Sequence, residues 1–320
     1  MIRLGIIGAG KIVPFHIDAL IAAGFSINGI CSTPGSLNSR RLAERFKIPN
    51  VYDQISTLID SKIEAILIAV PKELLFPILS HALTTDKKIL VEKPLFMGSE
   101  RFNLPSHSER NVMVAYNRRY YNTVQTFKSR VESSKSGTFL FRIPELSFNP
   151  NPTNFDILET LKGNTVHYFD LINYIFESST PEYRFIERRT SLKNLRRTIF
   201  FDYGSYDGIV DITFGVPGNY RLDFMNHGMC SSLSPIELFT ESDGMAIAQP
   251  TSDLPIRTYA PTNSKGNFKA IIEDSRYKPG FLAQSLDFFN FMTKGHSKTS
   301  ASIIDAVSAA KIADSIAFMS

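Results

Sequence analysis

The chain has 320 residues, 43% of them hydrophobic and 21% charged, a length and composition typical of a two-domain globular protein. A formal net charge of +4, with Lys and Arg scattered rather than striped, is too small to indicate a nucleic-acid binder. Two cysteines exclude a disulfide framework, and the start, MIRLGIIGAG, is not a signal peptide, so we expect a cytoplasmic protein.

The first part of the chain alternates short apolar runs with amphipathic segments. The apolar runs are typical of buried strands and cover 2–8, 26–32, 65–70, 88–92 and 111–117. The segments between them have apolar residues at helical spacing, over 11–24, 38–46 and 73–83. Nearly all-apolar strands that alternate with helices predict an α/β fold with a doubly wound parallel sheet.

The pattern changes after Asn117. We expect a helix over 118–133, a strand over 137–148 and a helix over 164–176. Turns with Gly and Asn then separate strand-like runs at 196–204, 206–215, 219–228 and 234–242, which predict an antiparallel sheet. The chain ends in two helical segments, 281–295 and 302–319.

A glycine-rich turn follows the first strand and precedes the first helix. Gly8 permits the tight turn, and Gly10 has no side chain to block a pyrophosphate that faces the helix amides. The third glycine of G-x-G-x-x-G is replaced by Val13, so the match is incomplete. The turn nevertheless lies between a strand and a helix, which favours a dinucleotide site. We expect Lys11 and Ile12 to belong to that site.

The end of the second strand predicts which dinucleotide is bound. No Asp or Glu occurs from Cys31 to Ala43, where an acid usually binds the ribose of NAD. Ser32 and Thr33 stand there instead, with Arg40 further on, and these residues suit a 2′-phosphate. We therefore expect NADP, with NAD possible.

Three further motifs accompany the glycine turn: Glu92-Lys93-Pro94 after a buried strand, AYNRRYY at 115–121, and VHYFDLINYIF at 166–176. Together with YKPGFLAQSLDFFNF at 277–291, their order resembles the glucose–fructose oxidoreductase/inositol dehydrogenase (Gfo/Idh/MocA) family over the whole chain. The resemblance implies a Rossmann domain over 1–119. It also implies a second α/β domain over 120–320, with an open, mainly antiparallel sheet and last helices that pack back on the core.

The resemblance also implies a reaction, namely NAD(P)-dependent hydride transfer at a carbinol carbon of a sugar derivative. Lys93 matches the catalytic lysine of the family and His167 its second acid/base group. The expected cofactor contacts are Gly8, Gly10, Lys11, Ile12, Ser32, Thr33, Arg40, Pro71, Glu92, Lys93 and Asn117. The expected substrate contacts are Arg118, Arg119, Asn164, Asp170 and Tyr277. No metal site is expected, and a homo-oligomer, dimer or tetramer, is implied.

The sequence departs from the family where an Asp often lies four residues before the histidine. Gly163 and Thr165 replace the Asp-x-Gly of that pattern, and Asn164 cannot take a proton. This variant resembles members associated with sugars of surface polysaccharides, so we expect a nucleotide-activated or acidic sugar. The alternatives are a free sugar or polyol (inositol-like) dehydrogenase and a catalytically quiet dinucleotide-binding regulator.

Overall fold

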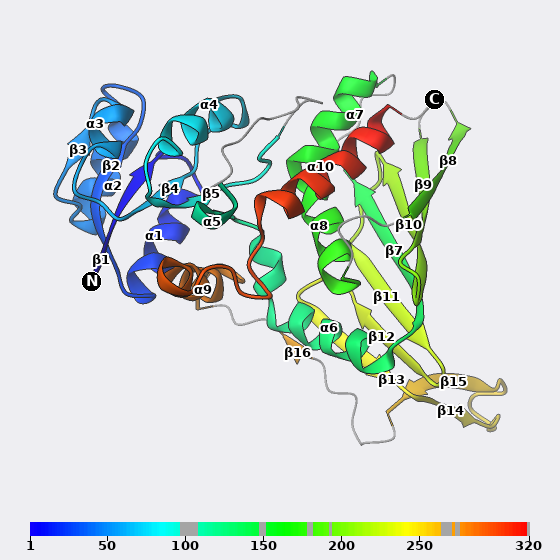
Figure 1. Ribbon diagram of the computed structural model, residues 1–320. Helices are drawn as coiled ribbons and strands as arrows, with labels where there is room; N and C mark the ends of the chain where they lie inside the picture. The colour runs from blue at the N-terminus through cyan, green and yellow to red at the C-terminus, as the bar shows by residue number, and fades with distance from the viewer. Residues whose placement is uncertain are drawn as a thin grey trace. The chain divides into compact units, whose positions relative to one another are not determined.

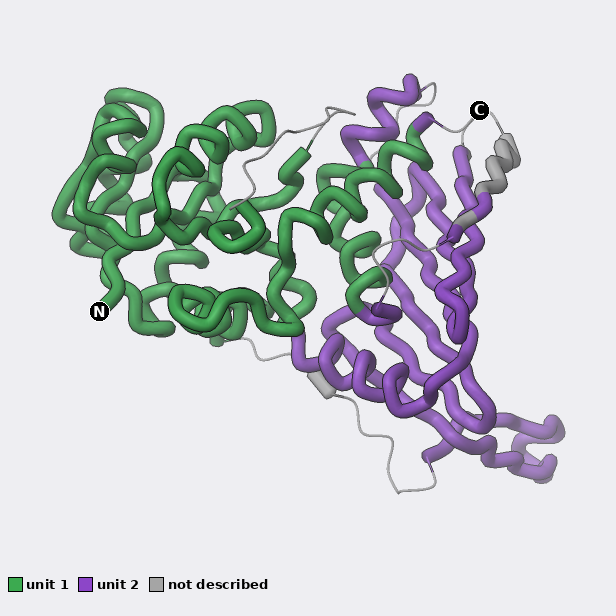
Figure 2. The backbone as a smooth tube through the Cα atoms, viewed as in Figure 1, with its two compact units in different colours: residues 1–120, 161–174, 274–317 green, residues 121–160, 175–273, 318–320 purple. Residues whose placement is uncertain are grey.

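The structure, a computed structural model, describes residues 1–96, 108–146, 152–177, 182–191, 194–263, 271–272 and 276–318. Its contacts divide the chain into two compact units (Figure 2). The first unit comprises residues 1–120, 161–174 and 274–317, and the second comprises 121–160, 175–273 and 318–320. The chain therefore leaves the first unit after Tyr120 but returns to it twice. The segment 161–174, expected in the second domain, groups with the first.

The first unit contains a six-stranded parallel sheet (Figure 1). Across the sheet the strands are β3 (Val51–Tyr52), β2 (Phe25–Cys31), β1 (Ile2–Ile7), β4 (Ala65–Ile68), β5 (Lys88–Val91) and β6 (Val112–Val114). Every pairing between them is parallel, which confirms the predicted doubly wound sheet. The carboxyl ends of β1 and β4 therefore meet at one edge, where ligands bind in such sheets.

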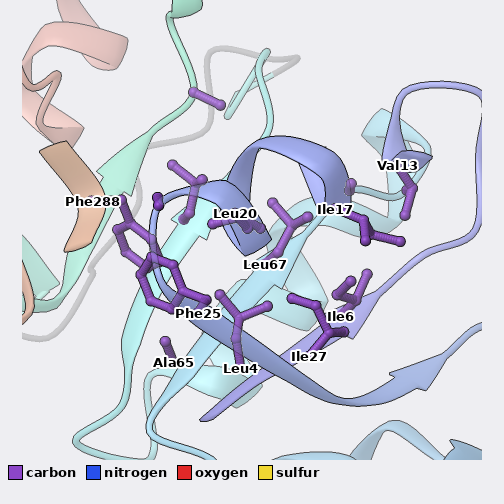
Figure 3. Close-up of a cluster of buried hydrophobic side chains, with 14 of the residues drawn as sticks. Leu4, Ile6, Val13, Ile17, Leu20, Phe25, Ile27, Ala65, Leu67 and Phe288 are labelled. Atoms are coloured by element: carbon purple, nitrogen blue, oxygen red, sulfur yellow. The ribbon is translucent and has the colours of Figure 1, made fainter. Parts of the chain in front are cut away.

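The helices that follow these strands are α1 (Val13–Ala22), α2 (Leu37–Phe46), α3 (Ile55–Ile59), α4 (Lys72–Ala82) and α5 (Ser108–Asn111). Figure 3 shows Ile17 and Leu20 of α1 packed over Leu4 of β1 and Leu67 of β4. All four side chains are fully buried, and each contributes about 1.5–3 kcal/mol by leaving water. This core holds the glycine turn, which lies between β1 and α1, in a fixed place.

Two parts of the first unit differ from the sequence prediction. β3 and α3 are so short that they give no periodic signal. The strand expected over 111–117 is shorter, because Asn111 ends α5 and Asn117 begins a 3₁₀ turn, η1 (Asn117–Tyr120). The 3₁₀ turn matters for the site, since it gives Arg118 and Arg119 different directions.

The remaining helices of the first unit come from later in the chain. A π-helical turn, η2 (Leu161–Thr165), leads into α8 (Val166–Ile175), and α9 (Phe281–Lys294) and α10 (Ile303–Ala317) complete the unit. Phe288 of α9 stacks on Phe25 of β2 with 5.4 Å between ring centroids. α9 therefore packs against the parallel sheet.

The second unit contains an eight-stranded sheet in the order β16-β13-β12-β11-β7-β10-β9-β8. These strands are β16 (Ile271–Ile272), β13 (Leu238–Ser242), β12 (Met229–Leu233), β11 (Arg221–Asn226), β7 (Gly137–Glu145), β10 (Tyr206–Phe214), β9 (Asn194–Asp202) and β8 (Glu182–Ser191). β7 and β10 pair in parallel and all other neighbours are antiparallel, which confirms a mainly antiparallel sheet.

The second unit also has α6 (Asn122–Ser134), α7 (Asn154–Thr160) and a separate hairpin of β14 (Gly244–Ala248) and β15 (Thr258–Thr262). No helix among the described residues has the length and apolarity needed to span a membrane.

Candidate active site

The glycine turn has the geometry that a dinucleotide requires. Gly8 has φ +118°, and a Cβ there would lie 2.0 Å from the carbonyl oxygen of Ala69 at the end of β4. A Cβ on Gly10 would meet nothing within 4 Å. The N-cap residue of α1, Ile12, makes no side-chain cap, so the positive end of the helix dipole is not covered by a side chain. Gly8 is therefore needed for the fold, and Gly10 leaves space for a ligand.

The ends of β2 and β4 line the same edge of the sheet. Ser32 is half-buried, while Thr33 and Arg40 are exposed, Arg40 on the first turn of α2. Pro71 is exposed at the N-cap of α4, two residues after Ala69. With Gly8, Gly10 and Ile12, these residues form what we call the glycine-turn region. Their arrangement fits a nicotinamide dinucleotide, because backbone and small side chains leave the edge open.

The structure brings an acid to this edge that the sequence reasoning missed. Tyr52 of β3 pairs with Cys31 of β2, so Asp53 follows at the level of Ser32. Burial, with a contribution from the Asp53 carboxylate, raises the pKa of the Cys31 thiol, which shows that the two groups are near each other. Asp53 is distant in sequence from the second strand, so only the strand pairing could have revealed it.

Lys93 follows β5 and reaches across to the π-helical turn. Its Nζ donates to the carbonyl oxygen of Gly163 at 2.6 Å. Burial lowers the pKa of Lys93, the charge of Glu92 raises it and the charge of Arg118 lowers it, with a net shift downward. Lys93 is therefore a lysine that loses its proton more easily than an exposed one, and a neutral carbonyl holds its amine.

The carboxylate of Glu92 is held by a histidine that the sequence analysis did not consider. His16 of α1 is 1% exposed, and its Nε2 lies 2.7 Å from Oε1 of Glu92. The other carboxylate oxygen, Oε2, accepts the backbone N–H of Lys93 at 3.2 Å. The available signal was a polar residue on the apolar face of α1, one helical turn from Val13 and Leu20.

The π-helical turn carries Gly163 and Asn164 toward this site. Gly163 is exposed, and a Cβ on it would meet nothing within 4 Å. Its neighbour Lys162 is buried and pairs with Asp314 of α10 at 2.7 Å, which anchors the turn. A π-helical turn widens the helix locally and often marks a functional site.

Arg118 and His167 complete the group around the amine. Nη2 of Arg118 donates to Oδ1 of Asn164 at 3.0 Å, and its guanidinium lies 4.3 Å from the ring centroid of Tyr168. Burial and the charges of Arg118 and Lys93 lower the pKa of His167 well below its ordinary value. The buried imidazole is therefore neutral at neutral pH. We call Lys93, Arg118 and residues 163–168 the amine region.

One ring nitrogen of His167 is buried and available for a ligand. Within the described residues, nothing hydrogen-bonds its Nδ1, which is buried. The Tyr116 ring packs edge-on against the imidazole, with 5.7 Å between centroids. A neutral imidazole with an unsatisfied nitrogen can exchange a proton with a bound hydroxyl.

Arg119 and Asp170 lie in a different environment from the one expected for substrate ligands. They form a buried, bidentate ion pair, with Nε–Oδ2 at 2.8 Å and Nη2–Oδ1 at 2.6 Å. Nη2 also lies 3.3 Å from Asp305 of α10, and the Tyr174 ring lies beneath the guanidinium. Burial raises the pKa of Asp170 to about 6, against the opposing effect of Arg119. These contacts connect η1, α8 and α10, so the pair holds the site together.

Two further predicted residues lie near the start of α9. Nδ2 of Asn117 donates to the carbonyl oxygen of Pro279 at 3.0 Å. Tyr277 is half-buried two residues before Pro279. Lys11 is exposed in the glycine turn. The described residues contain no group of three or more His, Cys, Asp or Glu side chains that could hold a metal ion.

Residues 2–115 match the family described as "Oxidoreductase family, NAD-binding Rossmann fold". Residues 2–115 are thus a Rossmann domain of the Gfo/Idh/MocA oxidoreductase family. A curated relative, inositol 2-dehydrogenase of Corynebacterium glutamicum, is 28% identical over 183 residues, which cover 54% of each chain. The match thus spans about half the length of the curated relatives.

Solved structures with the same fold match nearly all of the chain. The UDP-N-acetylglucosamine 3-dehydrogenase of Acidithiobacillus ferrooxidans has a TM-score of 0.71 and 14% identity, with 98% of this chain and 96% of that chain covered. A levoglucosan dehydrogenase in complex with NADH has a TM-score of 0.72 and 19% identity, with the same shares covered. At these identities the likeness shows the fold of the whole chain.

Proposed function

We propose that the protein is an NAD(P)-dependent oxidoreductase that transfers a hydride between nicotinamide and a carbinol carbon of a sugar derivative. The observation that supports this most is the hydrogen bond from the Lys93 amine to the carbonyl oxygen of Gly163. Gly163 lies four residues before His167, whose imidazole is neutral. Oxidation of a hydroxyl to a carbonyl requires groups that accept the hydroxyl proton, and an amine with a lowered pKa near a neutral imidazole can do this.

The chain's own residues would handle the hydroxyl proton. Lys93, with its lowered pKa, hydrogen-bonds the reacting oxygen and supports removal of its proton. His167 shares that proton through Nδ1, and burial together with the charge of Arg118 lowers the pKa of both groups. When bound at the glycine-turn region, the nicotinamide supplies the hydride acceptor or donor.

For the cofactor, Ser32, Thr33 and Arg40 favour NADP, because they offer hydroxyls and a cation to a 2′-phosphate. Asp53 opposes this, since a carboxylate at the same edge repels a phosphate and can bind a ribose hydroxyl. We retain NADP, because Arg40 is exposed on the first turn of α2 and can move toward the ligand. A parallel fluorescence titration with NADPH and NADH tests this: tighter NADH binding overturns the NADP assignment and keeps the enzyme.

For the substrate, Arg118 and Asn164 favour an anionic sugar, such as a nucleotide-activated or acidic sugar. Tyr277 stays in the proposal as a pocket residue. Arg119 and Asp170 bind each other and Asp305, so we propose that they hold the site together rather than bind substrate. The fold occurs both in a nucleotide-sugar dehydrogenase and in a levoglucosan dehydrogenase, so it does not choose between the classes.

The test is a turnover screen with nucleotide sugars, sugar acids and polyols, repeated with Lys93→Met. We expect the variant to lose activity about 10²–10⁴-fold and to keep dinucleotide binding. The matched control is Lys311→Met, because Lys311 is exposed on α10. Unchanged turnover in Lys93→Met contradicts the proposed role of Lys93.

A catalytically quiet regulator is the second candidate, favoured by the missing carboxylate at Gly163. It predicts dinucleotide binding without turnover on any sugar in the screen. The retained Lys93 and His167 favour the enzyme.

A homo-oligomer is also part of the proposal. In β10, Gly208, Val210 and Ile212 are buried, whereas Ile209 and Thr213 on the opposite face are only half-buried. Phe200 of the adjacent β9 is 40% exposed on that face. The same face carries the Arg196–Asp211 ion pair, and we propose this mixed apolar and charged surface as the contact with a second copy of the chain. Sedimentation at working concentration tests it, and a monomer contradicts it.

A further inference from the structure

His16, Glu92 and Lys93 form a connected set that the proposed reaction does not yet use. His16 is on α1, directly after the glycine turn, and Glu92 and Lys93 end β5. Because Nε2 of His16 lies 2.7 Å from a carboxylate oxygen, it must carry the hydrogen and donate. The imidazole is fixed in turn by the Phe281 ring of α9, with 4.6 Å between ring centroids.

Both oxygens of Glu92 are occupied away from the Lys93 amine. Oε1 accepts from His16, and Oε2 accepts the backbone N–H of Lys93 at 3.2 Å. The amine instead donates to Gly163 at 2.6 Å. This distribution is unexpected, because an adjacent carboxylate is the natural ion-pair partner of a lysine with reduced access to water.

We infer that His16 is a positioning residue which holds the carboxylate of Glu92 away from the Lys93 amine and so keeps that amine available to substrate. Without the imidazole, Oε1 loses its donor while remaining half-buried beside Lys93. The carboxylate would then turn toward Nζ, because a charged oxygen with reduced access to water is stabilised by a cationic partner. The amine would then leave Gly163 and hold its proton more tightly. This inference rests on the role of Lys93 given under Proposed function.

Several charged and titratable groups lie near His16, Glu92 and Lys93. Glu92 itself and Arg118 of η1 influence Lys93, and Lys93 in turn influences His167 of α8. Near Phe281, Nζ of Lys278 lies 5.9 Å from the ring centroid. Of these, Glu92 is the group whose position His16 controls directly.

The test measures the Lys93 amine without substrate or cofactor. Trace acetylation across a pH series, read by mass spectrometry of the Lys93 peptide, gives the pH midpoint of its reactivity. The exposed Lys135 serves as the internal reference for the reagent. The variants are His16→Leu, which removes the donor, and His16→Gln, whose amide can donate to Glu92. His16→Leu combined with Glu92→Gln removes the charge as well, and the exposed His81→Gln is the control.

We expect His16→Leu to raise the midpoint of Lys93 by about one pH unit, or roughly tenfold slower labelling at a fixed lower pH. His16→Gln and the double variant should return to the wild-type midpoint or below it, and His81→Gln should not differ. A wild-type midpoint in folded His16→Leu overturns the inference. Should that variant not fold, His16→Asn is too short to reach Oε1, and a wild-type midpoint in it has the same consequence.

The result is separable from the proposed function. A raised midpoint in His16→Leu, together with no sugar turnover in the wild type, would keep the role of His16 toward the amine and remove the dehydrogenase. An unchanged midpoint together with turnover that depends on Lys93 would do the opposite.

Discussion

The glycine-turn region and the amine region lie in the same unit but use different physical means. In the first, the decisive features are backbone conformation and missing side chains, at Gly8 and Gly10, and the flanking residues are open to solvent. In the second, burial and neighbouring charges lower the pKa values of Lys93 and His167. A binding edge can thus be built from local geometry, whereas a reactive group needs a surrounding of charges and buried surface.

The largest effect we expect comes from the buried ion pair next to the amine region. Asp170→Asn removes the bidentate carboxylate from the buried Arg119 guanidinium, so the free energy of unfolding should fall by about 3–5 kcal/mol. Urea unfolding followed by far-UV circular dichroism measures this. Glu64→Gln is the control, since it breaks an exposed pair with Arg3 and should cost about 0–1 kcal/mol. Equal losses in both variants contradict the structural role of the Arg119–Asp170 pair.

The two glycines of the turn should separate folding from binding. Gly8→Ala introduces a contact with the Ala69 carbonyl at a positive φ, so it should destabilise the protein by about 1–3 kcal/mol. Gly10→Ala meets no protein atom, so stability should stay the same or rise by up to about 1 kcal/mol. Its dinucleotide affinity should fall about tenfold, measured by nicotinamide fluorescence. Full affinity in Gly10→Ala removes the ligand from this turn.

We expect Arg118 to affect the reactivity of Lys93 and His167, whereas the neighbouring Arg119 affects stability. Its charge lowers the pKa of both Lys93 and His167, so Arg118→Met should raise both. Oxidation of the alcohol needs Lys93 without its proton, and the rate therefore rises with pH through the pKa of Lys93. We expect this rise to move about one pH unit upward in the variant, seen in the pH profile of turnover. An identical profile would show that the charge of Arg118 is screened from the amine.

The smallest expected effect is the contribution of His167 to stability at low pH. Its folded-state pKa is well below the ordinary value of about 6.5, so the unfolded chain takes up a proton that the folded chain does not. Stability should therefore fall as the pH decreases below about 6.5, by up to about 1.4 kcal/mol per pH unit. His167→Gln should flatten this part of the curve in thermal unfolding across pH 5–8. An unchanged slope would show that the imidazole is solvated.

Most of the parallel sheet could be predicted from the sequence. Strands β1, β2, β4 and β5 are buried on both faces, so their residues are nearly all apolar and give a direct signal. The glycine turn was predictable too, because the requirement for Gly8 is a property of its own φ and of the strand that precedes it. Short elements such as β3 and α3 were not, since two and five residues are too few for a periodic pattern to repeat.

The sequence by itself determined the candidate residues Lys93 and His167, and the tertiary structure alone decided their surroundings. Adjacency in the sequence did not predict which groups interact. Glu92 binds His16 rather than the Lys93 amine, and Arg118 binds Asn164 whereas Arg119 binds Asp170. Asp53 reaches the end of β2 only through strand pairing. The physical reason is that hydrogen bonds and charge effects depend on distance in space. A conformational requirement such as that of Gly8 depends on the local backbone, which the sequence records directly.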